Sequence, residues 1–261
     1  MLRAFSTAAT GMNAQQMMID VISNNLANIN TTGFKRSQID FQDLLYLKQR
    51  EAGSEVAAGV ESPSGLEIGS GVRPASTVKV FTSGEMENTG KATDIAITGE
   101  GFLQVSLPNG DTRYTRDGSL QTNANGELVT TTGYLIQPSV SIPNNATGID
   151  IGKDGTVNVT MPSGDSVVVG NIQLARFSNP AGLASEGDNL LKETKASGAS
   201  IVGRPSTQGF GSIQAGFLEK SNVQMVKELV KLITAQRAYE TNSRAIRAGD
   251  DMLQTANQIV R

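Results

Sequence analysis

The stretch SNNLANINTTGFKR, residues Ser23–Arg36, decides how the beginning of this chain is interpreted. It continues a segment with apolar residues at helical spacing, yet it carries four asparagines within seven residues. Asparagine is a poor residue for a helix interior because its amide competes for backbone hydrogen bonds. Thr31-Thr32-Gly33 then stops the pattern, as a glycine does at many helix ends. The stretch predicts a helix over Leu2–Asn28 that ends in an amide-rich turn.

The predicted N-terminal helix has an apolar stripe along one face. Every seventh residue is apolar, namely Phe5, Met12, Ile19 and Leu26. A second set of positions, three or four residues away, changes from apolar to polar along the segment. Such a stripe is typical of a helix that packs along one seam with another helix.

The C-terminal segment, residues 221–261, repeats this design. Its apolar residues at sevenfold spacing are Met225, Leu232, Tyr239, Ile246, Leu253 and Val260. Ser221 with Gln224 resembles a capping box, and no proline interrupts the segment. Two helices with heptad stripes at opposite ends of one chain most simply pair with each other as a coiled coil.

Between the ends the hydrophobic pattern has period two. Alternation of apolar and polar residues predicts half-buried strands at 77–81, 93–98, 102–107 and 156–161. Turn signals separate them at Asn109-Gly110, Asp117-Gly118, Asn125-Gly126, Asp154-Gly155 and Ser163-Gly164; such pairs favour tight hairpins. The fold class is therefore α+β, with long N- and C-terminal helices pairing as a coiled coil and an inserted antiparallel all-β domain.

This pattern predicts five regions along the chain. They are an N-terminal helix (1–35), an extended linker with an insert (36–75), a central antiparallel β domain (76–199), a return linker (200–220) and a C-terminal helix (221–261). The linker and return linker are predicted from their glycine, serine and proline content.

The composition argues against most kinds of catalytic site. The 261 residues include no histidine and no cysteine, which excludes Ser-His-Asp and Cys-His constellations, disulfides and the commonest metal ligands. The carboxylates of the β region, such as Asp117 and Glu127, stand beside glycines, where they are usual turn formers. We expect no catalytic, cofactor-binding or metal-binding residue and no small-molecule ligand.

The charges and apolar runs exclude further classes. The net charge is −3, and the basic residues of the last segment alternate with acidic ones, which argues against nucleic-acid binding. Positive charges, including Lys35 and Arg36, gather slightly at the two ends, and we interpret them as ordinary solvated faces. No secretory signal pattern and no apolar run long enough to span a bilayer is present.

The two ends and the middle resemble one known family. SNNLANINTTGFKR and the last segment, SNVQMVKELVKLITAQRAYETNSRAIRAGDDMLQTANQI, resemble the terminal signatures of the axial rod and hook proteins of the bacterial flagellum. GEGFLQV (99–105), YTRDGS (114–119) and GELVTTTGYLIQP (126–138) resemble the central segment of that family. The length and the insert SPSGLEIGSGVRP (62–74) are most similar to members that form the distal rod.

The resemblance implies a structural subunit that polymerises into the distal rod, a drive shaft that transmits motor torque to the hook. The implied partners are further copies of the chain, the proximal rod proteins, the hook or hook-junction protein, the basal-body ring proteins and the flagellar export apparatus. The implied location is the periplasmic rod of the basal body, reached through the flagellar type III channel without a cleaved signal peptide.

Three sets of residues are candidates for assembly contacts. The first is the heptad stripe of both helices. The second is an amide face formed by Asn13, Asn24 and Asn28, which either packs against neighbouring copies or is a solvated surface. The third is the insert, with Ser62, Pro63, Ser64, Gly65, Leu66, Gly69, Gly71 and Pro74, which either bridges neighbouring subunits or is a flexible loop.

Three alternative interpretations stay open. The main alternatives are another rod or hook axial protein and a secreted β-rich binding module on a helical stalk. A carbohydrate-active enzyme with two carboxylates is a third interpretation. An axial protein forms fibres or tubes as its concentration rises, whereas a stalked binding module stops at a closed oligomer.

Overall fold

The computed structural model describes residues 2–53, 55–57, 60–61, 63–207 and 209–259. The chain divides into two compact units. The first, here called the helix unit, consists of Met1–Leu26, Ser37–Val78 and Met225–Arg261. The second, here called the β unit, consists of Ala27–Arg36 and Lys79–Gln224. Both units are therefore built from segments that are far apart in the sequence.

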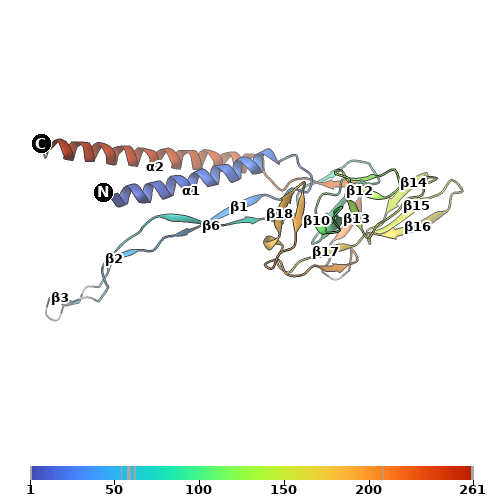
Figure 1. Cartoon of the computed structure of the whole chain (residues 1–261), viewed down its shortest axis with the longest axis horizontal. Coiled ribbons are helices and arrows are strands. Elements are labelled where there is room, and N and C mark those ends of the chain that lie inside the picture. Colours follow the sequence, from blue (N-terminus) through green and yellow to red (C-terminus); the bar gives the residue numbers. More distant parts are fainter. Residues whose placement is uncertain (1, 54, 58–59, 62, 208, 260–261) are drawn as a thin grey trace. The chain divides into compact units, whose positions relative to one another are not determined.

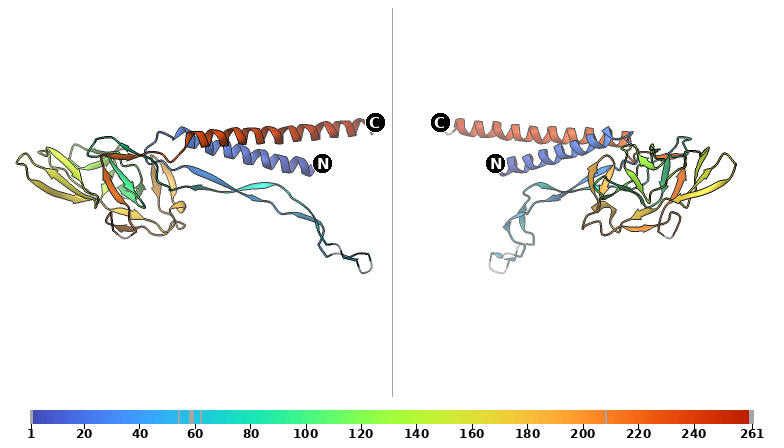
Figure 2. Two further views of the ribbon diagram at one scale, coloured as in Figure 1. Left: turned by 180° about the vertical axis from the view of Figure 1, so that it is seen from behind. Right: turned by 45° about the vertical axis from the view of Figure 1, so that its right-hand side comes forward.

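Two long helices, α1 (Leu2–Ala27) and α2 (Met225–Ile259), lie side by side in the helix unit (Figures 1 and 2). They approach closely at two glycines. A Cβ atom added to Gly11 would lie 2.9 Å from Nδ2 of Asn242, and one added to Gly249 would lie 2.8 Å from Cζ of Phe5. The two contacts run in opposite directions along the helices, so the pair is antiparallel. The prediction of long terminal helices that pair with each other is confirmed.

The described residues between 37 and 79 form a two-stranded ribbon. The strand β1 (Ser37–Asp43) pairs with β6 (Val72–Lys79), β2 (Leu47–Arg50) with β5 (Leu66–Ile68), and β3 (Glu55–Ala57) with β4 (Val60–Glu61). Figure 1 shows β1 and β6 continuing into the narrower part of the ribbon that contains β2 and β3. The predicted strand at 77–81 overlaps the end of β6, so it pairs with β1 in this ribbon.

The β unit is built around a nine-stranded sheet whose main path is β11-β12-β13-β9-β10-β19-β18; β17 also pairs with β9, and β20 pairs with β17. Its strands are β9 (Phe102–Ser106), β10 (Thr112–Thr115), β11 (Leu120–Thr122), β12 (Leu128–Thr130), β13 (Leu135–Gln137), β17 (Leu174–Arg176), β18 (Ala184–Gly187), β19 (Leu190–Lys192) and β20 (Ile201–Gly203). A second sheet contains β14 (Gly148–Ile151), β15 (Thr156–Thr160) and β16 (Ser166–Asn171). A short 3-10 helix covers Pro180–Gly182. The prediction of an inserted antiparallel all-β domain is confirmed.

The region 200–220 contributes strands to the β unit. Besides β20, it contains β21 (Ser212–Ala215), which pairs with β8 (Ile95–Thr98), and β22 (Phe217–Glu219), which pairs with β7 (Met86–Asn88). Each of these strands is short and lies near glycines. For this reason the composition of the region indicates a linker. The pairing partners lie more than a hundred residues earlier in the chain, and local sequence does not display them.

The core of the β unit consists of two apolar clusters. Leu103, Val105 and Ile213 are fully buried members of the larger cluster, while Phe102 belongs to the smaller one. Strand β9 therefore faces both clusters and is buried on both sides, which differs from the half-buried strand predicted there. Strand β15 does alternate between buried and partly exposed residues, as predicted.

Four of the five predicted turn pairs lie in hairpin loops. Loop-closing hydrogen bonds surround Asn109-Gly110, Asn125-Gly126, Asp154-Gly155 and Ser163-Gly164, where they join residues 107 and 111, 123 and 127, 152 and 156, and 161 and 165. Asp117-Gly118 differs, because it connects β10 to β11 across the unit. A Cβ atom on Gly118 would lie 1.7 Å from the carbonyl oxygen of Ile95, so this glycine is required by a close backbone approach.

A cross-strand ion pair predicts a pH dependence of stability. In the β unit, Nε of Arg113 lies 2.5 Å from Oε2 of Glu186, and Nζ of Lys192 lies 3.3 Å from Oε1. The hydrogen bond from Arg113 lowers the pKa of Glu186 below its usual value. A carboxylate with a lowered folded-state pKa stabilises the fold above its unfolded-state pKa, about 4.3, and loses this contribution as the pH falls through the folded-state value.

Glu186→Gln is therefore expected to lower the melting temperature at pH 7. The difference in melting temperature between wild type and this variant should become smaller as the pH is lowered past 4. Thermal melts followed by circular dichroism over this pH range measure the difference. Glu100→Gln is the control, because Glu100 is mostly exposed and lies 3.9 Å from Arg176. A difference between wild type and Glu186→Gln that stays constant down to pH 3 contradicts the assignment.

Candidate assembly surfaces

Small and polar residues line the seam between α1 and α2. The described residues that are buried on the two helices are Ala14, Ile22 and Asn25 on α1 and Glu228, Ala235 and Gly249 on α2. Gly249 lies against Phe5 across the seam, whereas Asn25 bonds to Ser37. Small residues let two helices approach closely but bury little apolar surface. At about 25 cal/mol per Å² of apolar area, such a seam contributes only modest hydrophobic stabilisation.

The predicted heptad stripe flanks these buried residues. Phe5, Met12, Ile19, Leu26, Leu232, Ile246 and Leu253 are half-buried. Met225 and Tyr239 are exposed, and Val260 lies outside the described residues. The structure thus places most of the stripe beside the seam, whose centre is occupied by smaller side chains.

Helix α2 also carries large apolar side chains that face away from α1. Val226 is 74% exposed, Val230 58% and Ile233 50%, and Leu229 is exposed beside them. These four residues, here called the outer stripe, lie at i, i+3, i+4 and i+7 and share one helix face. A contiguous exposed apolar face of this kind marks an interaction surface.

The predicted amide residues have different environments. Asn13 and Asn24 are exposed on α1, whereas Asn28 is half-buried and its Oδ1 accepts a hydrogen bond of 3.1 Å from Thr31 Oγ1. The asparagine that sequence analysis missed is Asn25, which is buried. Its side chain donates to the carbonyl oxygen of Ser37 and accepts from the amide of Ser37, both at 2.8 Å. Asn25 therefore joins the end of α1 to the start of the ribbon.

The insert residues lie on the ribbon. Pro63, Ser64, Gly65, Leu66, Gly69 and Pro74 are exposed, Gly71 is half-buried, and Ser62 lies outside the described residues. The ribbon contacts α1 at the first residue of β6, because the amide of Val72 donates to Oγ1 of Thr10 at 3.4 Å. Gly71 has φ +112°, and a Cβ there would lie 2.2 Å from the same oxygen.

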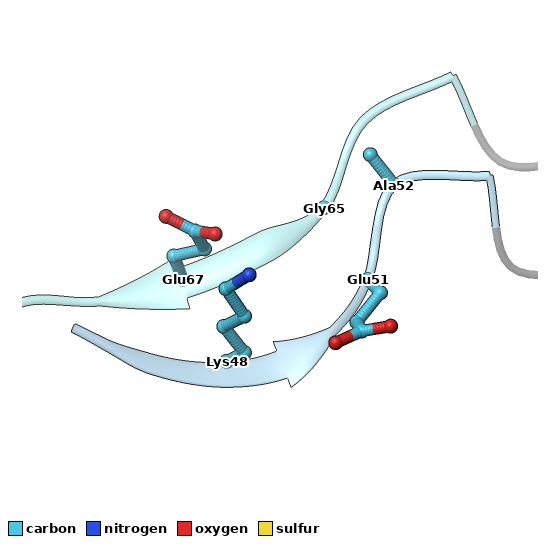
Figure 3. Close-up of a pocket in the computed structure, with 5 residues that line it drawn as sticks. All are labelled: Lys48, Glu51, Ala52, Gly65 and Glu67. Carbon is cyan, nitrogen blue, oxygen red and sulfur yellow. The ribbon is translucent and has the colours of Figure 1, made fainter.

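Farther along the ribbon, apolar and charged side chains are both exposed. Leu45, Leu47, Leu66 and Ile68 are large, exposed and apolar. Lys48 and Glu67 stand opposite each other on paired strands, and with Glu51 they line a shallow hollow (Figure 3). The ribbon thus presents a mixed surface suited to contact with another protein.

A buried charged cluster lies in the β unit. It joins Lys35, in the segment after α1, and Glu219, in the segment before α2, to Arg116 in the middle of the sequence. Oε1 of Glu219 accepts hydrogen bonds from Nζ of Lys35 at 2.6 Å and from the amide of Gly84 at 2.9 Å, and Oε2 accepts from Nε of Arg116 at 3.2 Å. Nζ of Lys35 also donates to the carbonyl oxygen of Thr82. Lys35 is 3% exposed and Glu219 1%. The interpretation of Lys35 as part of a solvated face is therefore wrong.

Arg116 makes two further hydrogen bonds in this cluster, both to backbone carbonyl oxygens. Nη1 of Arg116 donates to the carbonyl oxygens of Gly99 at 2.8 Å and Gly101 at 2.7 Å. Burial lowers the pKa of Lys35, and the nearby Arg116 charge lowers it further, while Glu219 opposes both effects. The cluster needs its one carboxylate, because two buried cations without an anion would repel each other.

Polar side chains extend the cluster to the rest of the TTGFKR segment. Thr32 Oγ1 donates to Asp117 Oδ1 at 2.9 Å, and Nδ2 of Asn189 bonds both to Asp117 Oδ2 and to the carbonyl oxygen of Thr32 at 3.2 Å. The amide of Gly33 donates to the carbonyl oxygen of Glu219 at 2.8 Å. These contacts join the N-terminal segment to the YTRDGS turn.

Asn222 completes the same connection from the C-terminal side. Its Oδ1 accepts from the amide of Arg36 at 2.8 Å, and its Nδ2 donates to the carbonyl oxygens of Val80 at 2.8 Å and Thr82 at 3.1 Å. Lys35, Arg116 and Glu219, together with Thr32, Asp117, Asn189 and Asn222, are called the clasp below. Lys35, Arg116 and Glu219 are buried and the other four residues are half-buried, and no local sequence pattern distinguishes these polar residues from solvent-exposed ones.

The described part of the chain contains no group of three or more Asp or Glu residues placed to hold a metal ion. Among the described helices, none is long and apolar enough to cross a membrane. The described residues do form four surfaces and contacts: the helix seam, the outer stripe, the ribbon and the clasp.

Family comparisons cover the same three parts of the chain. Residues 5–35 match the model described as flagella basal body rod protein, residues 96–159 the flagellar hook protein FlgE/F/G D1 domain, and residues 214–259 the flagellar basal body rod FlgEFG protein C-terminal region. The first and last matched regions contain the two helices, and all three contain clasp residues.

Several full-length relatives are similar over the whole chain. The flagellar basal-body rod protein FlgG of Borreliella burgdorferi is 44% identical over 264 residues, covering 100% of both chains. FlgG of Buchnera aphidicola subsp. Schizaphis graminum is 46% identical over 99% of this chain and 100% of the relative, and FlgG of Caulobacter vibrioides is 46% identical over 99% of each. With helices, β unit and ribbon all included in these matches, the chain belongs to the FlgG family of flagellar basal-body rod proteins.

Proposed function

We propose that this chain is a structural subunit that polymerises into the distal rod of the bacterial flagellar basal body and transmits motor torque to the hook. The observation that carries the proposal is the outer stripe of α2. Its apolar side chains stay exposed after α1 and α2 have paired, so the helix pair has a second face available for a neighbour.

Further copies of the chain are the proposed neighbours at the outer stripe. A head-to-tail contact between different faces of identical subunits repeats without closing, as a rod requires. Covering Val226, Val230 and Ile233 removes apolar surface from water at about 25 cal/mol per Å². In the polymer, the helix pairs form an inner layer and the β units an outer one.

The exposed amides and the ribbon supply further contacts in this proposal. Asn13 and Asn24 pack against neighbouring helices, where an amide both donates and accepts hydrogen bonds without adding charge. The ribbon bridges neighbouring subunits through exposed residues such as Leu45 and Leu66 and stiffens the shaft.

The finer partners and location belong to the same proposal. The rod contacts the proximal rod proteins at one end, the hook or hook-junction protein at the other, and the basal-body ring proteins around it. The subunit reaches the periplasm through the flagellar type III channel. It has no enzymatic activity, and its contribution is mechanical.

Val230→Asp is expected to abolish polymerisation while the β unit stays folded, because a charge buried in a subunit contact costs several kcal/mol, on the order of an unpaired buried ion after relaxation. Electron microscopy and sedimentation of concentrated protein measure the polymer. Val168→Asp is the matched control, because Val168 lies on β16 in the β unit and is 60% exposed. Normal fibres from Val230→Asp, or a closed oligomer from wild type, would contradict the proposal.

Deletion of residues 51–65 tests the role of the ribbon. The expected result is rods that assemble but bend, because the bridge between subunits is lost while the helix contacts remain. Electron micrographs of wild-type and deleted rods measure the curvature. Straight rods after the deletion would show that the ribbon does not stiffen the shaft. If no rods form, the ribbon is needed for assembly itself.

A further inference from the structure

The clasp holds two chain segments side by side, one just after the end of α1 and one just before the start of α2. The amide of Asn222 donates to the carbonyl oxygen of Phe34 at 3.4 Å, in addition to the bonds from Gly33 to Glu219 and from Arg36 to Asn222. Helix α1 ends at Ala27 and α2 begins at Met225. Only a few residues therefore separate the clasp from each helix.

The helix seam by itself distinguishes poorly between alternative registers. On α2, the residues that face α1 include Ala235, Asn242 and Gly249, and Ala238 lies half-buried between the first two. If α2 slid by one turn in the direction that brings position 238 to Gly11, the small side chain of Ala238 would take the place of Asn242. Coiled coils commonly fix their register with a specific polar contact, because uniform seams allow sliding.

We infer that the clasp sets the register of the α1–α2 pair through its covalent spacing to both helices. A buried ionic cluster is a costly way to stabilise a fold, and its best-attested benefit is structural specificity. Here Glu219 and Asn222 fix the start of α2 relative to Lys35 and Arg36, which follow α1. The seam then packs in the register that the clasp dictates.

A four-residue insertion shows whether the clasp or the helix seam sets the register of the α1–α2 pair. Ala-Ala-Lys-Ala placed between Gln224 and Met225 adds about one helical turn of 3.6 residues, so α2 keeps its face but advances by one turn. If the clasp sets the register, Gly11 should then face position 238 in place of position 242. The clasp residues themselves are unchanged, so the β unit stays folded.

Cysteine cross-linking measures this shift in the full-length chain, which has no cysteine of its own. In the wild-type background, Gly11→Cys with Asn242→Cys should form a disulfide and Gly11→Cys with Ala238→Cys should not. In the insertion background the expected result is reversed. Persistence of the 11–242 cross-link after insertion would overturn the inference, and so would loss of both cross-links, because the clasp would then impose no register.

Weakening the clasp provides a second test that leaves the chain length unchanged. Asn222→Ala removes the side-chain bonds to Arg36, Val80 and Thr82. The expected result is partial loss of the 11–242 cross-link with a gain at 11–238, while hydrogen exchange shows that the β-unit core remains protected. An unchanged 11–242 cross-link in this variant would assign the register to the seam.

Discussion

Glu219→Ala is expected to lower the free energy of unfolding of the β unit by about 3–5 kcal/mol, the range for removal of one partner from a buried ion pair. Glu219 is the only carboxylate that contacts Lys35 and Arg116 within hydrogen-bond distance in the described structure. Without it, two cations share a buried site, and the amide of Gly84 loses its acceptor.

Urea unfolding of the full-length chain, followed by circular dichroism, measures this loss. Glu87→Ala is the control, since Glu87 is 56% exposed and its carboxylate lies 3.3 Å from Nζ of Lys220. An exposed pair of this kind is worth about 0–1 kcal/mol. If the two variants lose similar stability, the clasp does not hold the β unit together. Restoration of stability by Lys35→Met in the Glu219→Ala background would show that the uncompensated charge is the cause.

Gly33→Ala is expected to destabilise the β unit for two separate reasons. Gly33 has φ +67°, and a side chain in that conformation costs about 1–2 kcal/mol. A Cβ there would also lie 2.7 Å from the backbone of Arg116 and Asp117, and overpacking of this kind adds about 1–3 kcal/mol. Because the obstacle is backbone, it cannot rotate away as a flexible side chain would.

Gly110→Ala separates the conformational cost of a side chain at positive φ from the cost of overpacking. Gly110 has φ +88° but no atom near its Cβ position, so this variant has the conformational cost alone, about 1–2 kcal/mol. Urea unfolding of both variants gives the difference between them. Equal losses would mean that the TTGFKR segment is not seated against the YTRDGS turn, whereas a larger loss at Gly33 measures that contact directly.

Local sequence patterns predicted the parts of this protein that depend on nearest neighbours in the chain. The apolar heptads predicted both helices, and α1 ends within one residue of the predicted position. Asn-Gly, Asp-Gly and Ser-Gly pairs predicted four hairpin loops, because positive φ is a property of the residues themselves. The resemblance of the terminal and central motifs predicted the family.

Long-range contacts were harder to predict. The sequence pattern predicts that strand β9 is half-buried. In the structure β9 is buried on both faces, because one apolar cluster packs on each face. The composition of region 200–220 predicts a linker. In the structure, β21 pairs with β8 and β22 pairs with β7, both far earlier in the chain. In both cases the deciding partner is distant in sequence, and no local pattern records it.

The opening stretch shows the same division within a few residues. By itself, the sequence determined that the helix ends near Asn28 and that the chain turns at Gly33, since helix propensity and backbone freedom are local properties. Only the tertiary structure decided that Asn25 bonds to Ser37 and that Lys35 is buried against Glu219. A charged or amide side chain suits water and a buried partner equally well, so its role depends on whether folding brings that partner within hydrogen-bond distance.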